Sequence, residues 1–386
     1  MKIAHVVSYF QPEFGYEEYY SAREQAKLGH EVHVITSDRI FPFKNVEKML
    51  KDIGSPYEDR ERPEGVEEME GFTVHRGPTR MEVLFDFIIY GGVEDTLARL
   101  EPDVVHAHGL WQWGSYKSAK IKDRIGFKLI LDEHGYSTTY DQGKSIRNWL
   151  LDKEYRTLRQ PYAKYTLKRS DRVVAVSSET EEFLRDHYGV KEVEMIPLGV
   201  DHRRFCPDEG RRRKVREEMG LEGKFVLVTA GRMDRAKRIH LFSDALRSIE
   251  DPDLRLIVVG TGDEEYLSEI REGADDRVSF LGFKRPDELA DLYNAADLGV
   301  WGKASITIRE AMGCGLPLLL LDTPDMRSLV KWDNGIMVKP DRIPDVISGL
   351  KSDVRLKEMG ENGRKAVEEE LSVEVEAKRL LDVYRG

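Results

Sequence analysis

Two cations and a carboxylate follow buried runs in the C-terminal half of the chain. Arg232 and Lys237 come after the apolar run 225–230, and Glu310 lies near the start of a predicted helix at 307–314. Cationic side chains suit a diphosphate, and a helix start adds about 0.3–1 kcal/mol toward an anion. A carboxylate accepts hydrogen bonds from a diol such as that of ribose. Together the three residues indicate a site for a nucleotide sugar.

Each of these residues also has a plain structural interpretation. The two cations could be surface side chains near a helix start. Thr307 could cap the helix, and Glu310, three residues later, would then complete a capping box. In the site interpretation, the backbone N–H groups from Ser305 and Ile306 onward face the phosphates, because the first turn of a helix has unpaired donors.

The elements that position these side chains are short apolar runs that alternate with amphipathic segments. Such alternation predicts parallel sheets covered on both faces. It pauses at 197–224, so we expect an α/β protein with two doubly wound, Rossmann-like domains, 1–198 and 199–370. The predicted strands are 2–7, 31–36, 72–76, 103–107, 127–132, 172–176, 193–196, 225–230, 254–259, 278–281, 297–301, 317–321 and 336–338; the predicted helices include 17–28, 93–100, 146–169, 237–249, 286–295 and 307–314.

Length and composition restrict the class of protein. A chain of 386 residues with 40% hydrophobic residues supports two cores, and a formal net charge of −11 argues against nucleic acid as a partner. The cysteines, Cys206 and Cys314, form no disulfide framework, which indicates a reducing compartment. No run nears the roughly 20 apolar residues of a membrane span. We expect a cytoplasmic protein and leave open a peripheral contact with the inner face of the membrane.

Two charged stretches are interpreted as surface structure. The basic run 211–216 is expected to be the solvated face of a helix rather than an anion-binding or membrane-binding patch. The stretch 40–70 has weak periodicity and predicts a loop with a short helix. The aromatic and basic segment 146–169 predicts a long amphipathic helix on the N-terminal domain, with contact to lipid headgroups as the alternative.

Histidines gather at two predicted strand ends in the N-terminal half. His106 and His108 alternate on one strand and therefore face the same side, and His134 follows another strand. With Glu133 they could form a metal site, as in a metal hydrolase. His106 could instead be a buried core histidine. We favour an active-site role for His108, nearest the strand end, and expect His134 to line the same cleft.

Several motifs, in matching order, resemble the retaining GT-B glycosyltransferases of family 4 over most of the chain. In the C-terminal half, the order and spacing of the motifs match over a long stretch. The matching segments are 29–36, 102–108, His134, 170–177, 196–201, Gly231-Arg232 with Lys237, Gly260-Thr261-Gly262, 280–283, Glu288-Leu289 with Leu292-Tyr293, Ala296-Asp297 and 310–317.

The resemblance implies a role for each matching residue. Arg232 and Lys237 bind the donor diphosphate, Glu310 binds the ribose, and a predicted helix at 371–386 crosses back to the N-terminal domain. The expected catalytic residues are His108, Arg232 and Lys237; the expected donor-binding residues are Gly15, Arg232, Lys237, Gly282, Phe283, Ser305, Ile306, Thr307 and Glu310; and Tyr16 and His134 are expected to line the cleft on the acceptor side.

The chain departs from the family pattern at two places. The family has a second glutamate eight residues before the one matching Glu310, where it contacts the donor sugar, and this chain has Gly302 there. A Gly-Gly pair is usual in the N-terminal loop, and this chain has Gly15-Tyr16. Without that glutamate, the sequence does not indicate which sugar the donor carries. Tyr16 is expected to narrow the approach to a phosphate or acceptor.

The resemblance implies transfer of a hexose from a UDP- or GDP-linked sugar to a hydroxyl of a glycan, lipid or small metabolite, with retained configuration. It implies no cofactor besides the donor and no metal. Two alternatives share the architecture: a nucleotide-sugar enzyme that does not transfer, such as an epimerase or phosphorylase, and a donor-binding protein that has lost catalysis with the change at Gly302.

Overall fold

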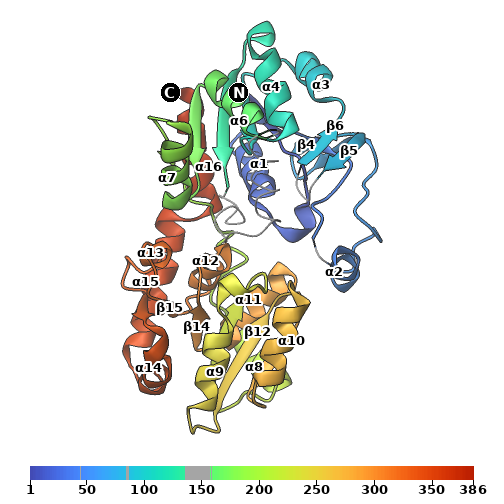
Figure 1. Cartoon of the computed structure of the whole chain (residues 1–386). Coiled ribbons are helices and arrows are strands. Elements are labelled where there is room, and N and C mark those ends of the chain that lie inside the picture. Colours follow the sequence, from blue (N-terminus) through green and yellow to red (C-terminus); the bar gives the residue numbers. More distant parts are fainter. Residues whose placement is uncertain (44, 84–86, 135–156, 158) are drawn as a thin grey trace. The chain divides into compact units, whose positions relative to one another are not determined.

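The computed structural model, which describes all residues except 44, 84–86, 135–156 and 158, divides into two compact units (Figure 1). The first unit comprises Met1–Leu50, Ser55–Leu198 and Val373–Gly386. The second comprises Lys51–Gly54 and Gly199–Ser372. Both are α/β, as predicted.

The second unit is built on a parallel sheet of six strands in the order β13-β12-β11-β14-β15-β16. Its strands are runs of Val, Leu and Ile that bury both faces; in β11, Val226 and Val228 enter one core while Phe225 and Leu227 enter the other. The strands are β11 (Phe225–Ala230), β12 (Leu254–Val259), β13 (Val278–Phe280), β14 (Leu298–Trp301), β15 (Leu318–Leu321) and β16 (Gly335–Val338).

Chain order reverses in this sheet where β11 pairs with β14, with Leu227 opposite Leu298. The loops that leave the carboxyl ends of two such strands diverge, and ligands bind in the crevice between them. The helices of this unit are α8 (Glu209–Glu218), η4 (Arg235–Lys237), α9 (His240–Arg247), α10 (Glu264–Gly273), α11 (Pro286–Ala295), α12 (Ile306–Gly313), α13 (Pro324–Arg327), η5 (Pro340–Arg342), α14 (Ile343–Leu350) and α15 (Arg355–Glu370).

The first unit has a sheet of eight strands in the order β10-β9-β8-β7-β1-β2-β4-β3, in which only β3 is antiparallel to its neighbour. Its order reverses between β1 and β7. The strands are β1 (Lys2–Val6), β2 (Glu31–Ser37), β3 (Gly65–Met69), β4 (Phe72–Gly77), β7 (Val104–His108), β8 (Lys128–Glu133), β9 (Arg172–Ala175) and β10 (Glu194–Met195), beside a hairpin of β5 (Thr79–Val83) and β6 (Phe87–Tyr90).

The helices of the first unit include the last one of the chain, so both termini belong to this unit (Figure 1). Leu380, Leu381 and Tyr384 of that helix join a core with residues of four strands, β1, β7, β8 and β9. The helices are η1 (Pro12–Phe14), α1 (Glu17–Lys27), α2 (Val46–Asp52), α3 (Val93–Leu100), α4 (Trp113–Ile125), α6 (Gln160–Arg169), α7 (Ser178–Tyr188) and α16 (Val373–Arg385). None of the helices within the described ranges is both long and apolar enough to cross a membrane.

The predicted strands are all present, within one or two residues at their ends. Sequence analysis did not predict β3, β5 and β6. Most side chains of β3 and β5 are exposed, so no apolar run marks these two strands, whereas β6 is a short apolar run that sequence analysis did not assign. The stretch 40–70 contains the expected short helix but also β3. Of the predicted helix 146–169, α6 is described, and the part from 146 to 156 lies outside the described residues.

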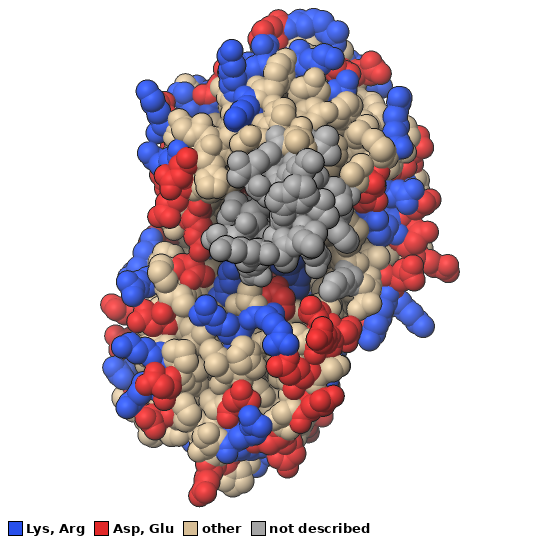
Figure 2. All heavy atoms as spheres, viewed as in Figure 1, with Lys and Arg blue, Asp and Glu red and all other residues tan. Residues whose placement is uncertain are grey.

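The interpretation of the basic run 211–216 as a solvated face was wrong for two of its residues. Arg212 and Arg216 of α8 both bond Asp297 at the start of β14, and their side chains are only 29% and 13% exposed. Arg212 also donates to the carbonyl oxygens of Asn294 and Ala296. These arginines dock α8 on the end of α11. Over the face drawn in Figure 2, Lys and Arg side chains are interspersed with Asp and Glu.

We expect Asp297→Ala to destabilise the second unit by about 2 kcal/mol, because the carboxylate also accepts the Val226 N–H at 2.8 Å and its loss leaves charged donors unpaired. That corresponds to a fall in melting temperature of about 4–8 °C in thermal unfolding. The matched control is Asp291→Ala, which removes an exposed pair with Arg211 and should change stability by less than about 0.5 kcal/mol. Equal shifts for the two variants would contradict this role of Asp297.

Candidate functional site

The loops after β11 and β14 meet at the point where the strand order of the second unit reverses. Thr307 Oγ1 donates to the Ala230 carbonyl at 2.8 Å, and Lys237 Nζ donates to the Ala304 carbonyl at 3.0 Å. Gly231 has φ +143°, and a Cβ there would lie 3.6 Å from Ser305 Oγ. Residues far apart in the sequence therefore form one site.

A third loop joins them from β12. A Cβ on Gly260 would lie 1.9 Å from the Gly231 carbonyl oxygen, so only glycine allows the two loops to touch. The Gly260 N–H donates to the Gly282 carbonyl at 2.7 Å, which places the Gly282-Phe283 turn beside this loop. Gly282 has φ +68°, a left-handed conformation that favours glycine.

The capping-box interpretation of Glu310 was wrong. Helix α12 begins at Ile306 with Ser305 as its N-cap residue, so Glu310 lies in the second turn rather than at the third helical position. The Thr307 hydroxyl bonds the Ala230 carbonyl and Ser305 Oγ instead of capping the helix. The N–H groups of the first turn, from Ile306 on, are therefore not capped by a side chain.

Glu310 is a half-buried carboxylate whose Oε2 is inaccessible and has no hydrogen-bond partner among the described residues. Burial raises its pKa to about 7, although Arg204 acts to lower it. Leaving a carboxylate unpaired and desolvated costs free energy. A pair of hydroxyl donors would offset that cost, which is what a ribose diol supplies.

The cations differ in their surroundings. Burial lowers the pKa of Lys237 to about 8, against an upward effect of Asp234, while Arg232 and Lys303 lower it further. The Arg232 side chain is 77% exposed and donates to Asp234 Oδ2 through Nε at 3.1 Å. Three positive charges thus act on one loop, and Lys303 is one that sequence analysis did not assign to the site. A diphosphate would relieve their repulsion.

Gly302 is enclosed by the loop that carries Lys237. A Cβ at Gly302 would lie 2.5 Å from the Lys237 carbonyl oxygen and 2.8 Å from the Arg238 Cβ. Packing against the Lys237 loop therefore requires a glycine at position 302, where the family has a glutamate. A carboxylate does reach the same loop from α13, where Asp325 accepts the Ala304 N–H at 3.2 Å and raises the pKa of Lys237.

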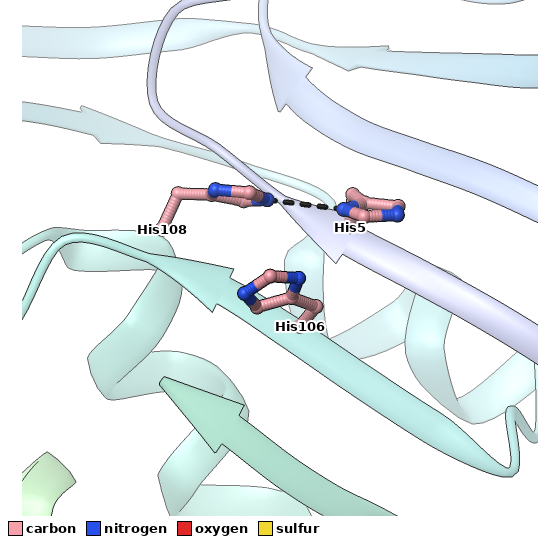
Figure 3. Close-up of side chains that lie close together, drawn as sticks. All are labelled: His5, His106 and His108. Carbon is pink, nitrogen blue, oxygen red and sulfur yellow. Dashed lines mark hydrogen bonds between the residues drawn. The ribbon is translucent and has the colours of Figure 1, made fainter. Parts of the chain in front are cut away.

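In the first unit, a cluster of histidines lies at the carboxyl ends of strands β1, β7 and β8. His106 and His108 face the same side, as expected, with ring centroids 4.5 Å apart. His108 Nε2 lies 3.0 Å from His5 Nδ1 (Figure 3). Asp132 Oδ2 lies 2.8 Å from His108 Nδ1 and 3.0 Å from His134 Nε2. The cluster lies where the strand order of this unit reverses.

Burial and charge divide these histidines into two kinds. Burial lowers the pKa of His5 well below its usual value, and it also lowers the pKa of His106, which is fully buried and bonds Tyr384 at 2.7 Å. His106 is thus a core histidine. For His108 and His134, burial acts to lower the pKa, but Asp132 outweighs it and both pKa values rise.

Glu133, the acidic residue of the alternative metal site, accepts the Leu110 N–H through Oε2 at 3.1 Å. Sequence analysis also did not predict the acidic residues Glu17 and Glu18 at the start of α1. Glu17 Oε2 lies 3.4 Å from His134 Nε2. The available signal was their position, because a helix that follows the central strand of such a sheet begins at the edge where the histidines lie.

The N-terminal loop leads into α1. Gly15 has φ +68°, and a Cβ there would lie 2.7 Å from the Tyr20 hydroxyl, which explains the glycine. Tyr16 is the N-cap residue of α1, is 41% exposed, and its ring centroid lies 6.0 Å from that of Phe43. A large, partly exposed aromatic side chain therefore stands at this helix start.

Comparison with known proteins identifies relatives. The curated D-inositol 3-phosphate glycosyltransferase of Rhodococcus jostii is 29% identical over an alignment of 325 residues, which covers 76% of this chain and 69% of that protein. Mannosylfructose-phosphate synthase of Agrobacterium fabrum is 32% identical over 170 residues, 39% of this chain and 37% of the relative. This chain therefore matches between about a third and two thirds of the length of these relatives.

Solved structures show the same fold. Sucrose-phosphate synthase from Thermosynechococcus elongatus superposes with a TM-score of 0.72 at 19% identity, covering 100% of this chain and 98% of that one. Anabaena HepE, solved in complex with UDP and glucose, gives a TM-score of 0.70 at 17% identity, covering 100% and 99%. The fold is GT-B.

Two family profiles match successive parts of the sequence. Residues 19–204 match the family described as Glycosyltransferase Family 4, and residues 224–352 match Glycosyl transferases group 1. The two matches fall on the first and second units in turn. By these two matches and its GT-B fold, the chain belongs to family 4 of the glycosyltransferases.

Proposed function

We propose that this chain transfers a hexose from a nucleotide diphosphate sugar, UDP- or GDP-linked, to a hydroxyl group of a glycan, lipid or small metabolite. The observation that supports the proposal is the contact between the loop that carries Lys237 and the start of α12, the helix of Glu310, where the strand order of the second unit reverses. The solved complex of Anabaena HepE with UDP and glucose supports a donor of this class.

In the proposed reaction, Arg232, Lys237 and the first turn of α12 stabilise the negative charge of the departing diphosphate. Fixed donors aimed at a developing charge are among the largest contributions to catalysis. With these cations present, the diphosphate needs no metal for charge balance. The anomeric configuration is retained by attack on the same face as the leaving group, His108 is a catalytic residue near the donor sugar, and Tyr16 and His134 line the acceptor side.

A second function, donor binding without turnover, is favoured by one observation. The place of the sugar-binding glutamate is occupied by Gly302, against which the Lys237 loop packs. A thermal-shift panel of UDP- and GDP-linked sugars identifies the donor, since a hundredfold excess over the dissociation constant stabilises by about 2.7 kcal/mol. Transfer assays with that donor then separate the two functions, because tight binding with no product on any acceptor supports the second.

Arg232→Ala and Lys237→Ala should each lower kcat/KM for sugar transfer by about 100-fold or more, because each removes a charge that opposes the leaving diphosphate. The melting temperature should change little for Arg232→Ala, whose side chain is 77% exposed. Lys357→Ala, on an 87% exposed side chain of α15, is the control and should keep full activity. Full activity in both site variants would refute the assignment.

Donor affinity should peak between pH 7 and pH 8. Glu310, with a pKa of about 7, accepts the ribose hydroxyls only when ionised, so affinity rises with pH up to that value. Lys237, with a pKa of about 8, attracts the diphosphate only when protonated, so affinity falls above it. Calorimetric titration with the donor at several pH values measures both limbs.

The variant Glu310→Gln should weaken donor binding by about tenfold or more. Its donor affinity should no longer rise with pH up to about pH 7, the acid limb of the profile, but should still fall above about pH 8. It should also be the more stable protein above pH 7: the folded-state pKa is raised, so ionisation opposes folding increasingly from about pH 4.5 to about pH 7. An acid limb that survives in Glu310→Gln would assign that limb to another group.

Gly302→Glu should not restore the family's sugar contact but should weaken donor binding, because its Cβ displaces the Lys237 carbonyl. Gly302→Ala adds the same Cβ without a carboxylate and should weaken binding equally. Gly349→Ala, where a Cβ meets nothing within 4 Å in α14, is the matched control. Tighter donor binding by Gly302→Glu than by the wild type would show that the Lys237 loop moves to accommodate the new side chain.

A further inference from the structure

The loop between β14 and α12 carries a lysine, Lys303, whose charge is not balanced within the described part of the chain. Lys303 is half-buried, and its ammonium group forms no hydrogen bond or ion pair with another described residue. Both of its neighbours lie against the Lys237 loop: a Cβ on Gly302 would lie 2.5 Å from the Lys237 carbonyl oxygen, and the Ala304 carbonyl accepts from Lys237 Nζ at 3.0 Å. The backbone of Lys303 is therefore held beside the proposed diphosphate site.

The direction of α12 indicates which part of the donor lies near Lys303. Glu310, the proposed ribose ligand, is about 6 Å along the helix axis from Ile306, where the helix begins. The diphosphate joins the ribose to the sugar. With the ribose at Glu310 and the diphosphate at the helix start, the sugar extends beyond that start, toward residues 302–305. Lys303 carries the only charged side chain of this segment.

We propose that the sugar of the donor carries a carboxylate, as a hexuronic acid does, and that Lys303 binds this carboxylate. The inference rests on the proposed function, since it concerns the donor of that reaction. In a nucleotide sugar each phosphate has one negative charge, and Arg232 and Lys237 offset these charges. Lys303 is a further cation, and a carboxylate on the sugar is the partner that offsets it, through a charge-assisted hydrogen bond.

The electrostatics of the loop support a ligand of this charge. The pKa of Lys237 is lowered by burial, and the charges of Arg232 and Lys303 lower it further. Repulsion from Lys237 and Arg232 thus disfavours a third cation in this place when the site is empty. A hexuronic acid donor relieves the repulsion at both of its charged ends, whereas a neutral sugar leaves Lys303 opposed by the other cations.

A charge balance between Lys303 and the carboxylates of the same loops is the competing explanation. Asp325 Oδ2 accepts the Ala304 N–H at 3.2 Å, and Asp234 accepts from Arg232 Nε and from the Lys237 N–H. Neither carboxylate forms an ion pair with Lys303 among the contacts of the described residues. The competing explanation gives Lys303 no effect on the choice of sugar, so binding measurements distinguish the two.

The test compares donors that differ only in whether C6 of the sugar is a carboxylate or an alcohol. The pairs are UDP-glucuronic acid with UDP-glucose, UDP-galacturonic acid with UDP-galactose, and GDP-mannuronic acid with GDP-mannose, each titrated calorimetrically into the full chain at low salt, with UDP and GDP as references. In the preferred pair, the acid should bind about tenfold more tightly than the alcohol, because hydrogen bonds between charged groups are the stronger kind. Added salt should reduce this difference.

The variant Lys303→Gln should abolish the preference for the acid. It should bind UDP or GDP at least as tightly as the wild type does, because a charge that repels Lys237 is gone. The control is Lys357→Gln, on an 87% exposed side chain of α15, which should keep the preference.

Two results would overturn the inference while leaving the proposed function standing: alcohols that bind as tightly as their acids, or a preference for the acid that survives in Lys303→Gln. In both cases a nucleotide sugar still binds. Absence of binding by every nucleotide and nucleotide sugar would instead refute the proposed function, and the inference with it.

Discussion

The parallel pairing of β11 with β14 is the constraint on which the candidate donor site depends. These two strands are far apart in the sequence, and their register places Leu227 beside Leu298. Because the chain leaves the two strands toward opposite edges of the sheet, the loops after them flank one space at the carboxyl ends of the strands. The bonds of Lys237 with Ala304 and of Thr307 with Ala230 depend on this pairing.

In the candidate donor site, burial disfavours the charged forms of two ionisable groups. The carboxyl of Glu310 has a pKa of about 7 and the amine of Lys237 a pKa of about 8, and burial is the main cause of both values. The Arg232 side chain, by contrast, is exposed. A ligand with a diol at one end and a diphosphate at the other would stabilise the ionised form of each buried group. The free energy of binding would therefore come partly from relieving unfavourable ionisation within the empty site.

The sequence predicts the central strands because they are buried on both faces and so appear as continuous apolar runs. It does not predict β3, whose residues are exposed at the sheet edge. It cannot distinguish Arg212, which faces carbonyl oxygens, from an arginine that faces water. The place of Thr307 and Glu310 in α12 depends on where the helix begins, and the sequence pattern predicted that start one residue late. Glu17 went unassigned because only the folded sheet brings it to His108 and His134.

The last helix of the chain has a consequence for synthesis. Tyr384 of α16 bonds His106 and accepts from Gln25, the residue that orients His5 and through it His108. On the ribosome, α16 emerges only after the whole second unit has been translated. The nascent first unit must therefore wait, with an apolar surface around Ile3, Val104 and Ile130 uncovered, until its final residues arrive. Its histidine network is among the last parts of the molecule to be assembled.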